Sequence, residues 1–208
     1  QRLHNHLMRL SLHDLQSIRK VLESNRIIPL KHLEQAYESF KEKNSLVDLE
    51  NQMDKIFFME SVKGANQLEA YGTRFRNFLL MHIDVMNIKN LLRFKREDLN
   101  AQQIMSYMIT SGRRLNKEYL KKLSQTDSME TLIKELKGTY YGSRVDFSTD
   151  VFTTEMNLAR FMNRQALLRS HQNPLSIESV LDFSMAKITE IRNLRSIIKS
   201  KHLGLDPE

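Results

Sequence analysis

The sequence predicts an all-α protein, and three observations carry that prediction. Only 6 of the 208 residues are glycine and 3 are proline, which favours long helices over a fold with many turns. Nearly every segment has apolar residues at helical spacing, and no stretch of useful length alternates as a strand does. One helical segment occurs twice, 106 residues apart, as DVMNIKNLLRFKREDL at 84–99 and EIRNLRSIIKSKHLGL at 190–205, which indicates an internal duplication.

The helices expected in the first half begin at recognisable starting residues. Capping boxes and a helix-opening proline mark three of them, and an amphipathic stripe marks the long fourth helix. They cover 11–24 from Ser11, 29–40 from Pro29, 45–61 from Ser45, and about 67–95, where the stripe includes Phe75, Phe78, His82, Val85 and Leu92.

The second half is expected to hold four more helices. Their boundaries follow from N-cap residues and from glycines that end a helix. They begin at Asn100 with a break at Gly112, at Asp127 with an end at Gly138, at Thr149 or Asp150 with an end near Ser170, and at Pro174 or Ser176 with an end near Gly204.

The duplication extends beyond the helix at 84–99. Arg9-Leu10-Ser11 matches Arg114-Leu115-Asn116 at an offset of 105, and Glu50 matches Glu155 at the same offset. We therefore expect two homologous helical lobes, residues 1–100 and 101–208. Each lobe is expected to place short helices first and two long antiparallel helices after them.

Composition limits the possible functions. The chain has no cysteine, so disulfides, thiolate metal sites and cysteine nucleophiles are excluded. The seven histidines are scattered, and no phosphate-binding loop, dinucleotide fingerprint or nucleophile elbow occurs. We assign no catalytic residue, no cofactor and no metal site. The net charge of +7 fits either a solvated basic surface or contact with an anionic partner.

The repeated helix carries an acid inside its apolar face. On a helical wheel, Asp84 lies between Leu91 and Ile88, and Glu190 takes the same place in the second copy. An acid is costly there unless it is paired. We expect Lys55 and Arg160, or Arg9 and Arg114, to pair with the acids, while Asn87 and Asn193 complete the hydrogen bonding. This interpretation makes Asp84, Asn87, Glu190 and Asn193 buried structural groups.

A basic stripe flanks the apolar face in both copies. Its members are Lys89, Arg93 and Arg96 in the first copy, and Arg195 and Lys199 in the second. A solvated helix face is one interpretation. A docking surface for an acidic partner or for lipid headgroups is the other.

The segments IDVMNIKNLLRFKRED and NPLSIESVLDFSMAKITEIRNLRSIIKSKHLGLDPE resemble the C subunits of archaeal-type (A/V-type) rotary ATPases, a family whose eukaryotic relative is the d subunit of the vacuolar ATPase. The shared pattern is an acid, two residues, Asn, then an aliphatic and a basic residue, followed by paired aliphatics and a base. It matches at Asp84–Arg93 and at Glu190–Lys199. The resemblance covers most of the chain.

The resemblance implies a funnel of three related lobes around a pseudo-threefold axis, of which this chain shows two, with an N-terminal third lobe absent. It implies a non-catalytic coupling subunit at the cytoplasmic face of the membrane. The partners would be the central-stalk subunits and the membrane rotor ring, with peripheral contact to the membrane surface and no nucleic acid. The alternatives are an α-helical repeat scaffold for protein–protein interaction and a nucleic-acid-binding helical protein, which only the basic charge favours.

Overall fold

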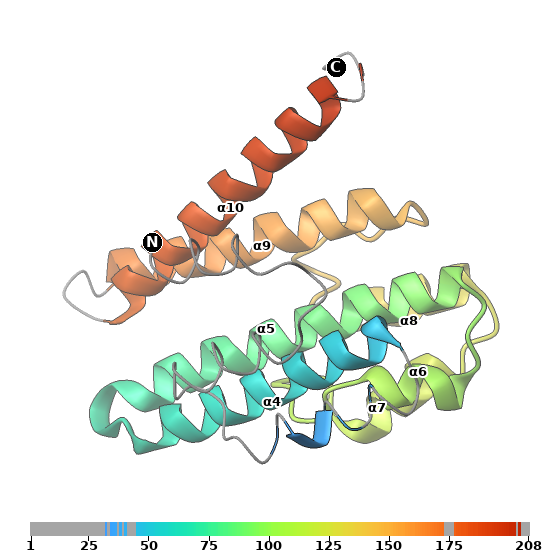
Figure 1. Ribbon diagram of the computed structural model, residues 1–208, viewed down its shortest axis with the longest axis horizontal. Coiled ribbons are helices and arrows are strands. Elements are labelled where there is room, and N and C mark those ends of the chain that lie inside the picture. Colours follow the sequence, from blue (N-terminus) through green and yellow to red (C-terminus); the bar gives the residue numbers. More distant parts are fainter. Residues whose placement is uncertain are drawn as a thin grey trace. The chain divides into compact units, whose positions relative to one another are not determined.

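Every regular element that the computed structural model defines is an α-helix (Figure 1). The described residues are 32, 34–36, 38, 40, 45–172, 177–202 and 204. The expected all-α class is confirmed. The chain forms two compact units, residues 1–68 and 69–208, which we describe separately.

The described part of the first unit centres on α4 (Leu46–Gln67), which begins where the sequence predicts. The Ser45 hydroxyl caps it by accepting a 3.2 Å hydrogen bond from the Asp48 N–H. The helix continues past the predicted end at Ser61. The expected helix over 11–24 lies outside the described residues. Within 29–40, the described residues are helical: His32, Glu34, Gln35, Ala36, Glu38 and Phe40.

The second unit is organised around its first helix, α5 (Glu69–Arg96), which matches the long helix predicted over 67–95. Its buried residues recur at helical spacing. They include Phe78, Met81, Val85, Ile88 and Leu92. Five other helices of the unit, α6, α7, α8, α9 and α10, contact α5 directly, so α5 is the central element of this unit.

Three short helices follow α5. The first, α6 (Ala101–Tyr107), begins with the predicted capping box of Asn100 and Gln103. The second, α7 (Lys117–Ser124), is capped by Asn116 and was not predicted. The third, α8 (Met129–Lys137), is capped by Ser128 rather than by the predicted Asp127, because the Ser128 hydroxyl accepts a 3.1 Å hydrogen bond from the Thr131 N–H.

Two long helices complete the unit, α9 (Val151–Gln172) and α10 (Ile177–His202). Their lengths are close to those of α4 and α5, the helices at the matching positions of the first sequence repeat. Both α4 and α9 have 22 residues, and they are offset by the same 105 positions as the sequence match. With 26 residues, α10 corresponds to the 28-residue α5. This agreement supports the repeat, while the division into two lobes at residue 100 stays a proposal.

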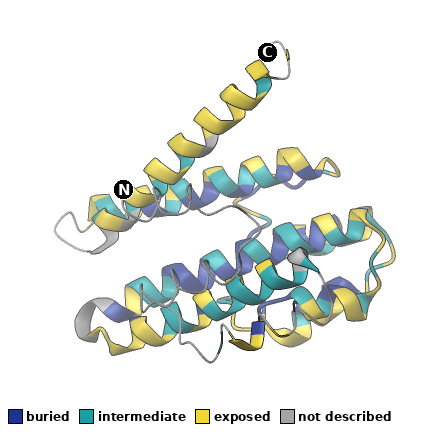
Figure 2. Ribbon diagram, viewed as in Figure 1, coloured by how far each residue is buried: buried dark blue, intermediate teal, exposed yellow. Residues whose placement is uncertain are grey.

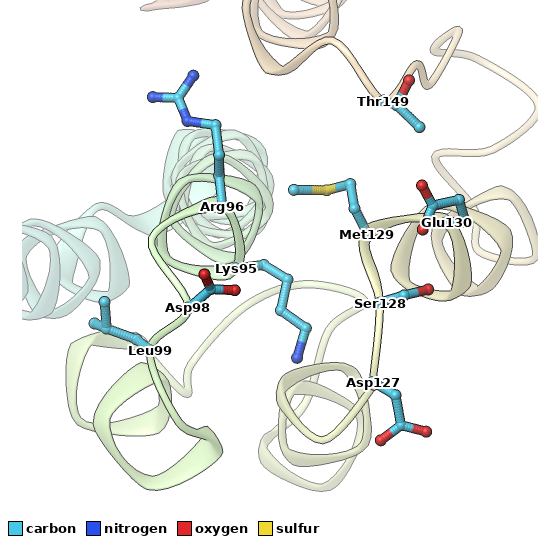
Figure 3. A pocket seen from close by; sticks show the side chains of 9 residues that line it. All are labelled: Lys95, Arg96, Asp98, Leu99, Asp127, Ser128, Met129, Glu130 and Thr149. Atoms are coloured by element: carbon cyan, nitrogen blue, oxygen red, sulfur yellow. The ribbon is translucent and has the colours of Figure 1, made fainter.

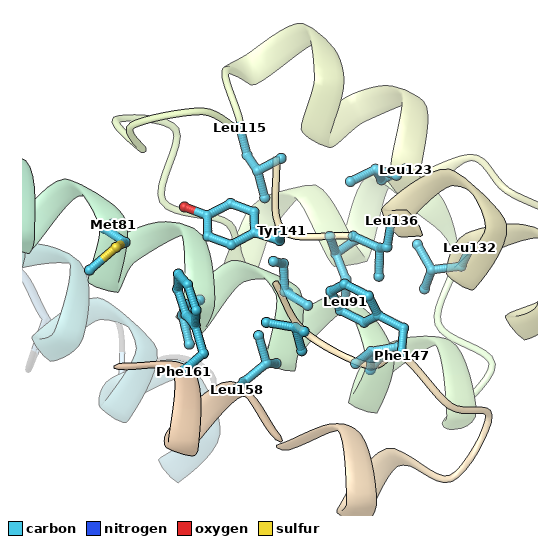
Figure 4. Packing of buried hydrophobic residues seen from close by; sticks show 14 of the residues in the cluster. Met81, Leu91, Leu115, Leu123, Leu132, Leu136, Tyr141, Phe147, Leu158 and Phe161 are labelled. Carbon is cyan, nitrogen blue, oxygen red and sulfur yellow. The ribbon is translucent and has the colours of Figure 1, made fainter. Parts of the chain in front are cut away.

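The hydrophobic core joins α5 to the elements that follow it. Leu91 of α5 packs in one cluster with Leu115, Leu132, Tyr141 and Leu158, and Figure 4 shows these side chains converging around the helix. The compact unit that begins at Glu69 therefore includes the long helix that ends the first sequence repeat, packed against side chains of the second repeat.

Helix α10 is buried much less than α5. It packs mainly on α9, and Figure 2 shows most of its length exposed. Large apolar side chains are among the exposed residues of α10. They are Val180, Phe183, Ile188, Ile191, Leu194, Ile197 and Ile198.

Candidate functional site

The most constrained polar site in the described residues surrounds Asp84, which is 0% exposed. One carboxylate oxygen accepts hydrogen bonds from the Arg114 N–H at 2.7 Å and from the Tyr141 hydroxyl at 2.6 Å. The other oxygen accepts from the Leu115 N–H at 3.2 Å. Both oxygens are therefore bound by the fold, and the carboxylate holds the loop before α7 against α5.

Asn87, one turn further along α5, binds the same loop through its carboxamide. Its NH₂ group donates to the Ile109 carbonyl at 2.7 Å, and its oxygen accepts from the Ile109 N–H at 2.9 Å. A side-chain amide that satisfies both main-chain groups of one residue fixes the register of that residue. Asp84 and Asn87 together anchor the segment 109–115 to the helix.

Gly112 allows the segment to approach this closely. A Cβ atom at this position would lie 1.9 Å from Oδ1 of Asp84, far inside van der Waals contact. The glycine that the sequence marks as a helix breaker therefore has a second role, which is to leave room for the carboxylate.

The electrostatics of the site follow from burial. Burial raises the pKa of the Asp84 carboxyl above the ordinary value of 3.8, and the hydrogen bonds from Tyr141, Arg114 and Leu115 oppose the rise. Burial and the neighbouring Asp84 raise the pKa of the Tyr141 phenol, so that it remains a donor. A buried acid with all its partners supplied by the fold is suited to architecture rather than to proton exchange with a substrate.

The donors to Asp84 differ from those the sequence predicts. Arg114 contributes its main-chain N–H rather than its guanidinium group, which lies 4.9 Å from the centre of the Tyr140 ring. Arg160 donates to Asn157 at 3.3 Å, and Arg9 lies outside the described residues. Main-chain donors suit a buried acid because they add no second charge that must be desolvated.

Sequence reasoning missed Tyr141 as a partner of Asp84. Figure 4 shows its ring near Leu115 and Phe161, and it meets the Phe161 ring edge to face at 5.8 Å. The available signal was a tyrosine pair after Gly138, which fits a corner between helices. The pattern of side chains does not reveal that the second tyrosine turns inward.

The second copy of the motif differs from the expectation of burial. Glu190 and Asn193 are exposed on α10, and Glu190 pairs with Lys187 at 2.7 Å. The physical reason is that no described element covers this face of α10, whereas the segment 109–115 covers the corresponding face of α5. Asp84 is therefore buried, whereas Glu190 is exposed in this chain.

The members of the basic stripe differ in their exposure and in their contacts. Arg93 forms a two-pronged ion pair with Glu155 of α9, in which Nη2 lies 2.7 Å from Oε2. That hydrogen bond raises the pKa of Arg93. Lys89 is half-buried, whereas Arg96, Arg195 and Lys199 are exposed. Arg93 therefore stabilises the contact between α5 and α9.

An open hollow of about 540 Å³ lies at the end of α5 (Figure 3). Lys95 extends into it between the end of α5 and the start of α8. Basic Lys95 and Arg96 share the lining with acidic Asp98, Asp127 and Glu130. Since both signs of charge line it, the hollow is not selective for an anion.

Neither a membrane span nor a metal cluster occurs in the described residues. No helix in that part of the chain is both long and apolar enough to cross a bilayer. No group of three or more histidine, aspartate or glutamate side chains in those residues is arranged to hold a metal ion.

Comparison with known proteins points to one family. The model of the family described as "ATP synthase (C/AC39) subunit" matches residues 3–208. Curated relatives, each named as the C subunit of an A-type ATP synthase, share 31% identity over 161 residues in Archaeoglobus fulgidus (77% of this chain and 46% of the relative). The identity is 26% over 179 residues in Methanosphaera stadtmanae (82% and 46%), and 25% over 186 residues in Methanocaldococcus jannaschii (86% and 46%). The chain thus spans about half the length of the curated relatives it matches.

Proposed function

The chain belongs to the ATP synthase (C/AC39) subunit family, and from that premise we propose that it is a non-catalytic coupling subunit of a rotary A/V-type ATPase. It would link the central stalk to the membrane rotor ring, so that torque passes between the ATP-hydrolysing or ATP-forming head and the ion-conducting ring. The family match over residues 3–208 is the observation that carries this proposal.

A mechanical role agrees with how the fold uses its buried polar side chains. Those described are Asp84, Asn87, Ser124 and Thr154. Each bonds to the main chain of the fold: Ser124 donates to the Lys121 carbonyl at 2.8 Å, and Thr154 donates to the Ser148 carbonyl at 2.9 Å. Groups held in this way give a stiff body, which a part that transmits torque needs.

Contact with the other subunits is proposed for the exposed part of the basic stripe. Arg96 and Arg195 are exposed and carry fixed positive charge. Such groups are suited to acidic side chains on a stalk subunit or to headgroups beside the ring. We place the protein peripherally, on the cytoplasmic face of the membrane.

Co-purification tests the proposal. The tagged chain is incubated with membrane rotor rings and with central-stalk subunits of an A-type ATP synthase, and the retained proteins are identified. Association with both is expected. Arg195→Glu is expected to weaken retention more than Lys117→Glu, which reverses an exposed charge on α7. Failure of the chain to retain either partner would contradict the coupling role.

A further inference from the structure

We propose that Arg144 and Arg114, beside the ring of Tyr140, form a docking site for an acidic segment of a partner protein. We call this surface the arginine corner. Its three residues lie in the loops before α7 and after α8, so it is distinct from the basic stripe on α5 and α10. The proposal rests on side-chain geometry and is independent of the coupling role.

The turn that carries Arg144 is held closely against the end of α8. The Gly142 N–H donates to the Thr139 carbonyl at 3.0 Å, and the next turn closes where the Arg144 N–H donates at 3.0 Å to the main chain. A Cβ atom on residue 142 would lie 1.9 Å from the carbonyl oxygen of Lys137, so glycine is needed for this close approach. The main chain below Arg144 is therefore fixed in place.

The Arg144 guanidinium is positioned by three contacts with its own turn. Its Nη1 group donates to the Tyr140 carbonyl at 2.8 Å and to the Ser143 hydroxyl at 2.7 Å. Its central carbon lies 3.8 Å from the centre of the Tyr140 ring, within the range of cation–π attraction. An arginine that is already held in one orientation loses little further side-chain entropy when it binds a partner.

These contacts leave one edge of the Arg144 guanidinium unused. Within the described residues, its hydrogen bonds all come from Nη1, and none comes from Nε or Nη2. Arg93 shows what this edge binds, because its Nε and Nη2 groups hold the two carboxylate oxygens of Glu155. A planar guanidinium matches a carboxylate in this two-pronged way. The exposed Arg144 therefore presents a carboxylate-binding edge to solvent.

A second guanidinium, that of Arg114, lies against the same ring, with its central carbon 4.9 Å from the centre of Tyr140. Its main-chain N–H is bound to Asp84, so its backbone is fixed while its side chain is exposed. Neither Arg114 nor Arg144 forms an ion pair with a carboxylate in the part of the chain that the structure describes. Two positive charges beside one ring repel each other, and an acidic partner relieves that repulsion.

The occupant we assign is a protein segment that carries several carboxylates. Arginine and tyrosine are the side chains enriched at the centres of protein interfaces. Both arginines of the corner are exposed, so a single small anion would stay largely in water, whereas a chain with several carboxylates engages both arginines at once. Membrane surfaces are bound by larger basic clusters and by apolar side chains that insert, and here the arginines cover the Tyr140 ring.

Hexaglutamate serves as the probe, and hexaglutamine is its neutral control. Each peptide is titrated into the full ¹⁵N-labelled chain at low salt, where screening is weak, and the amide signals of residues 140–145 are followed by NMR. We expect saturable shifts with hexaglutamate and none with hexaglutamine. Arg144→Lys keeps the charge but removes the two-pronged edge, so it is expected to weaken binding by about tenfold. Arg114→Lys, which retains the main-chain bond to Asp84, is expected to weaken it as well.

Two matched controls separate the proposed contact from general attraction between charges. Arg160 is an exposed arginine on α9 whose guanidinium donates to Asn157 at 3.3 Å, and Arg160→Lys is expected to leave binding unchanged. Tyr140→Phe retains the ring and is expected to bind within about twofold of the normal chain, whereas Tyr140→Leu removes the ring and is expected to bind about threefold to fivefold more weakly. Since Arg144 is exposed, Arg144→Lys is expected to unfold at the same urea concentration as the normal chain.

Three results would overturn the proposal. The first is equal binding of hexaglutamate to the normal chain and to both lysine variants at Arg114 and Arg144. The second is an equal shift of residues 140–145 by inorganic phosphate at the same ionic strength, which would make the corner a site for small anions. The third is cosedimentation of the chain with vesicles of phosphatidylglycerol and phosphatidylcholine that Arg144→Lys abolishes, which would make it a site for lipid headgroups.

Discussion

The Tyr141 hydroxyl donates a 2.6 Å hydrogen bond to the Asp84 carboxylate, and both side chains are 0% exposed. This contact joins the centre of α5 to a corner that lies 57 positions later in the chain. The same carboxylate binds the main chain before α7. One buried acid therefore holds two separate segments against a single helix.

Tyr141→Phe is expected to lower the free energy of unfolding by about 1.5–3 kcal/mol, because it removes a donor from a buried charged acceptor without leaving a cavity. Tyr140→Phe is the matched control. The Tyr140 ring packs under Arg144 at 3.8 Å and is only half-buried, so a change within about 0.5 kcal/mol is expected. Urea denaturation measures both; equal effects would contradict the role of the Tyr141 hydroxyl.

Gly112→Ala is expected to destabilise the protein by about 2–3 kcal/mol, because the added methyl group meets Oδ1 of Asp84 and forces the segment away from α5. Gly64→Ala is expected to change stability in the opposite direction. Gly64 lies inside α4, and nothing lies within 4 Å of the place that an alanine methyl group would take, so alanine is expected to stabilise by about 0.5–1 kcal/mol. Thermal unfolding of the two variants should shift in opposite directions, and a harmless Gly112→Ala would show that the contact is not close.

The stability of the protein is expected to carry a pH dependence from Asp84. Its pKa in the folded state is raised above 3.8 by burial, so the folded state binds the proton more tightly than the unfolded state. This contribution is full below the unfolded pKa and is lost as pH rises through the raised pKa. The unfolding free energy of the normal chain minus that of Asp84→Asn should therefore fall as pH rises above 3.8. A difference that grows over that window would contradict the raised pKa.

The Arg93–Glu155 ion pair is expected to contribute modestly. The Arg93 side chain is 53% exposed and the Glu155 side chain 19%, so solvent screens much of the attraction. A double-mutant cycle with Arg93→Ala and Glu155→Ala is expected to give a coupling free energy of about 0.5–1 kcal/mol. A coupling free energy near zero would mean that the two-pronged geometry adds nothing to the contact of α5 with α9.

Capping residues in the sequence made several helix starts predictable. Ser45 and Asn100 cap the helices that their sequences predict. The helix α7 was missed because it has only 8 residues, too few for a clear periodicity. Its sequence match to the Arg9-Leu10-Ser11 region was a usable signal, since that match places Asn116 at the position of Ser11.

The surroundings of the repeated acids were less predictable, because they depend on tertiary contacts. The helical wheel placed Asp84 and Glu190 on the same face, but burial requires a covering segment, which the described residues supply only for Asp84. The wheel also favoured basic side chains as partners. Main-chain N–H groups leave no trace in the sequence, so their role at Asp84 emerged only from the fold.

The repeated acid is an anchor that is filled in the first copy and open in the second. The most direct measurement of this difference is the unfolding free energy of Asp84→Ala compared with that of Glu190→Ala. We predict a loss of about 3–5 kcal/mol for Asp84→Ala, which leaves two N–H groups and a hydroxyl without an acceptor. For Glu190→Ala we predict a change within about 0.5 kcal/mol, since its side chain is 55% exposed. Equal losses in the two variants would contradict the difference between the two anchors.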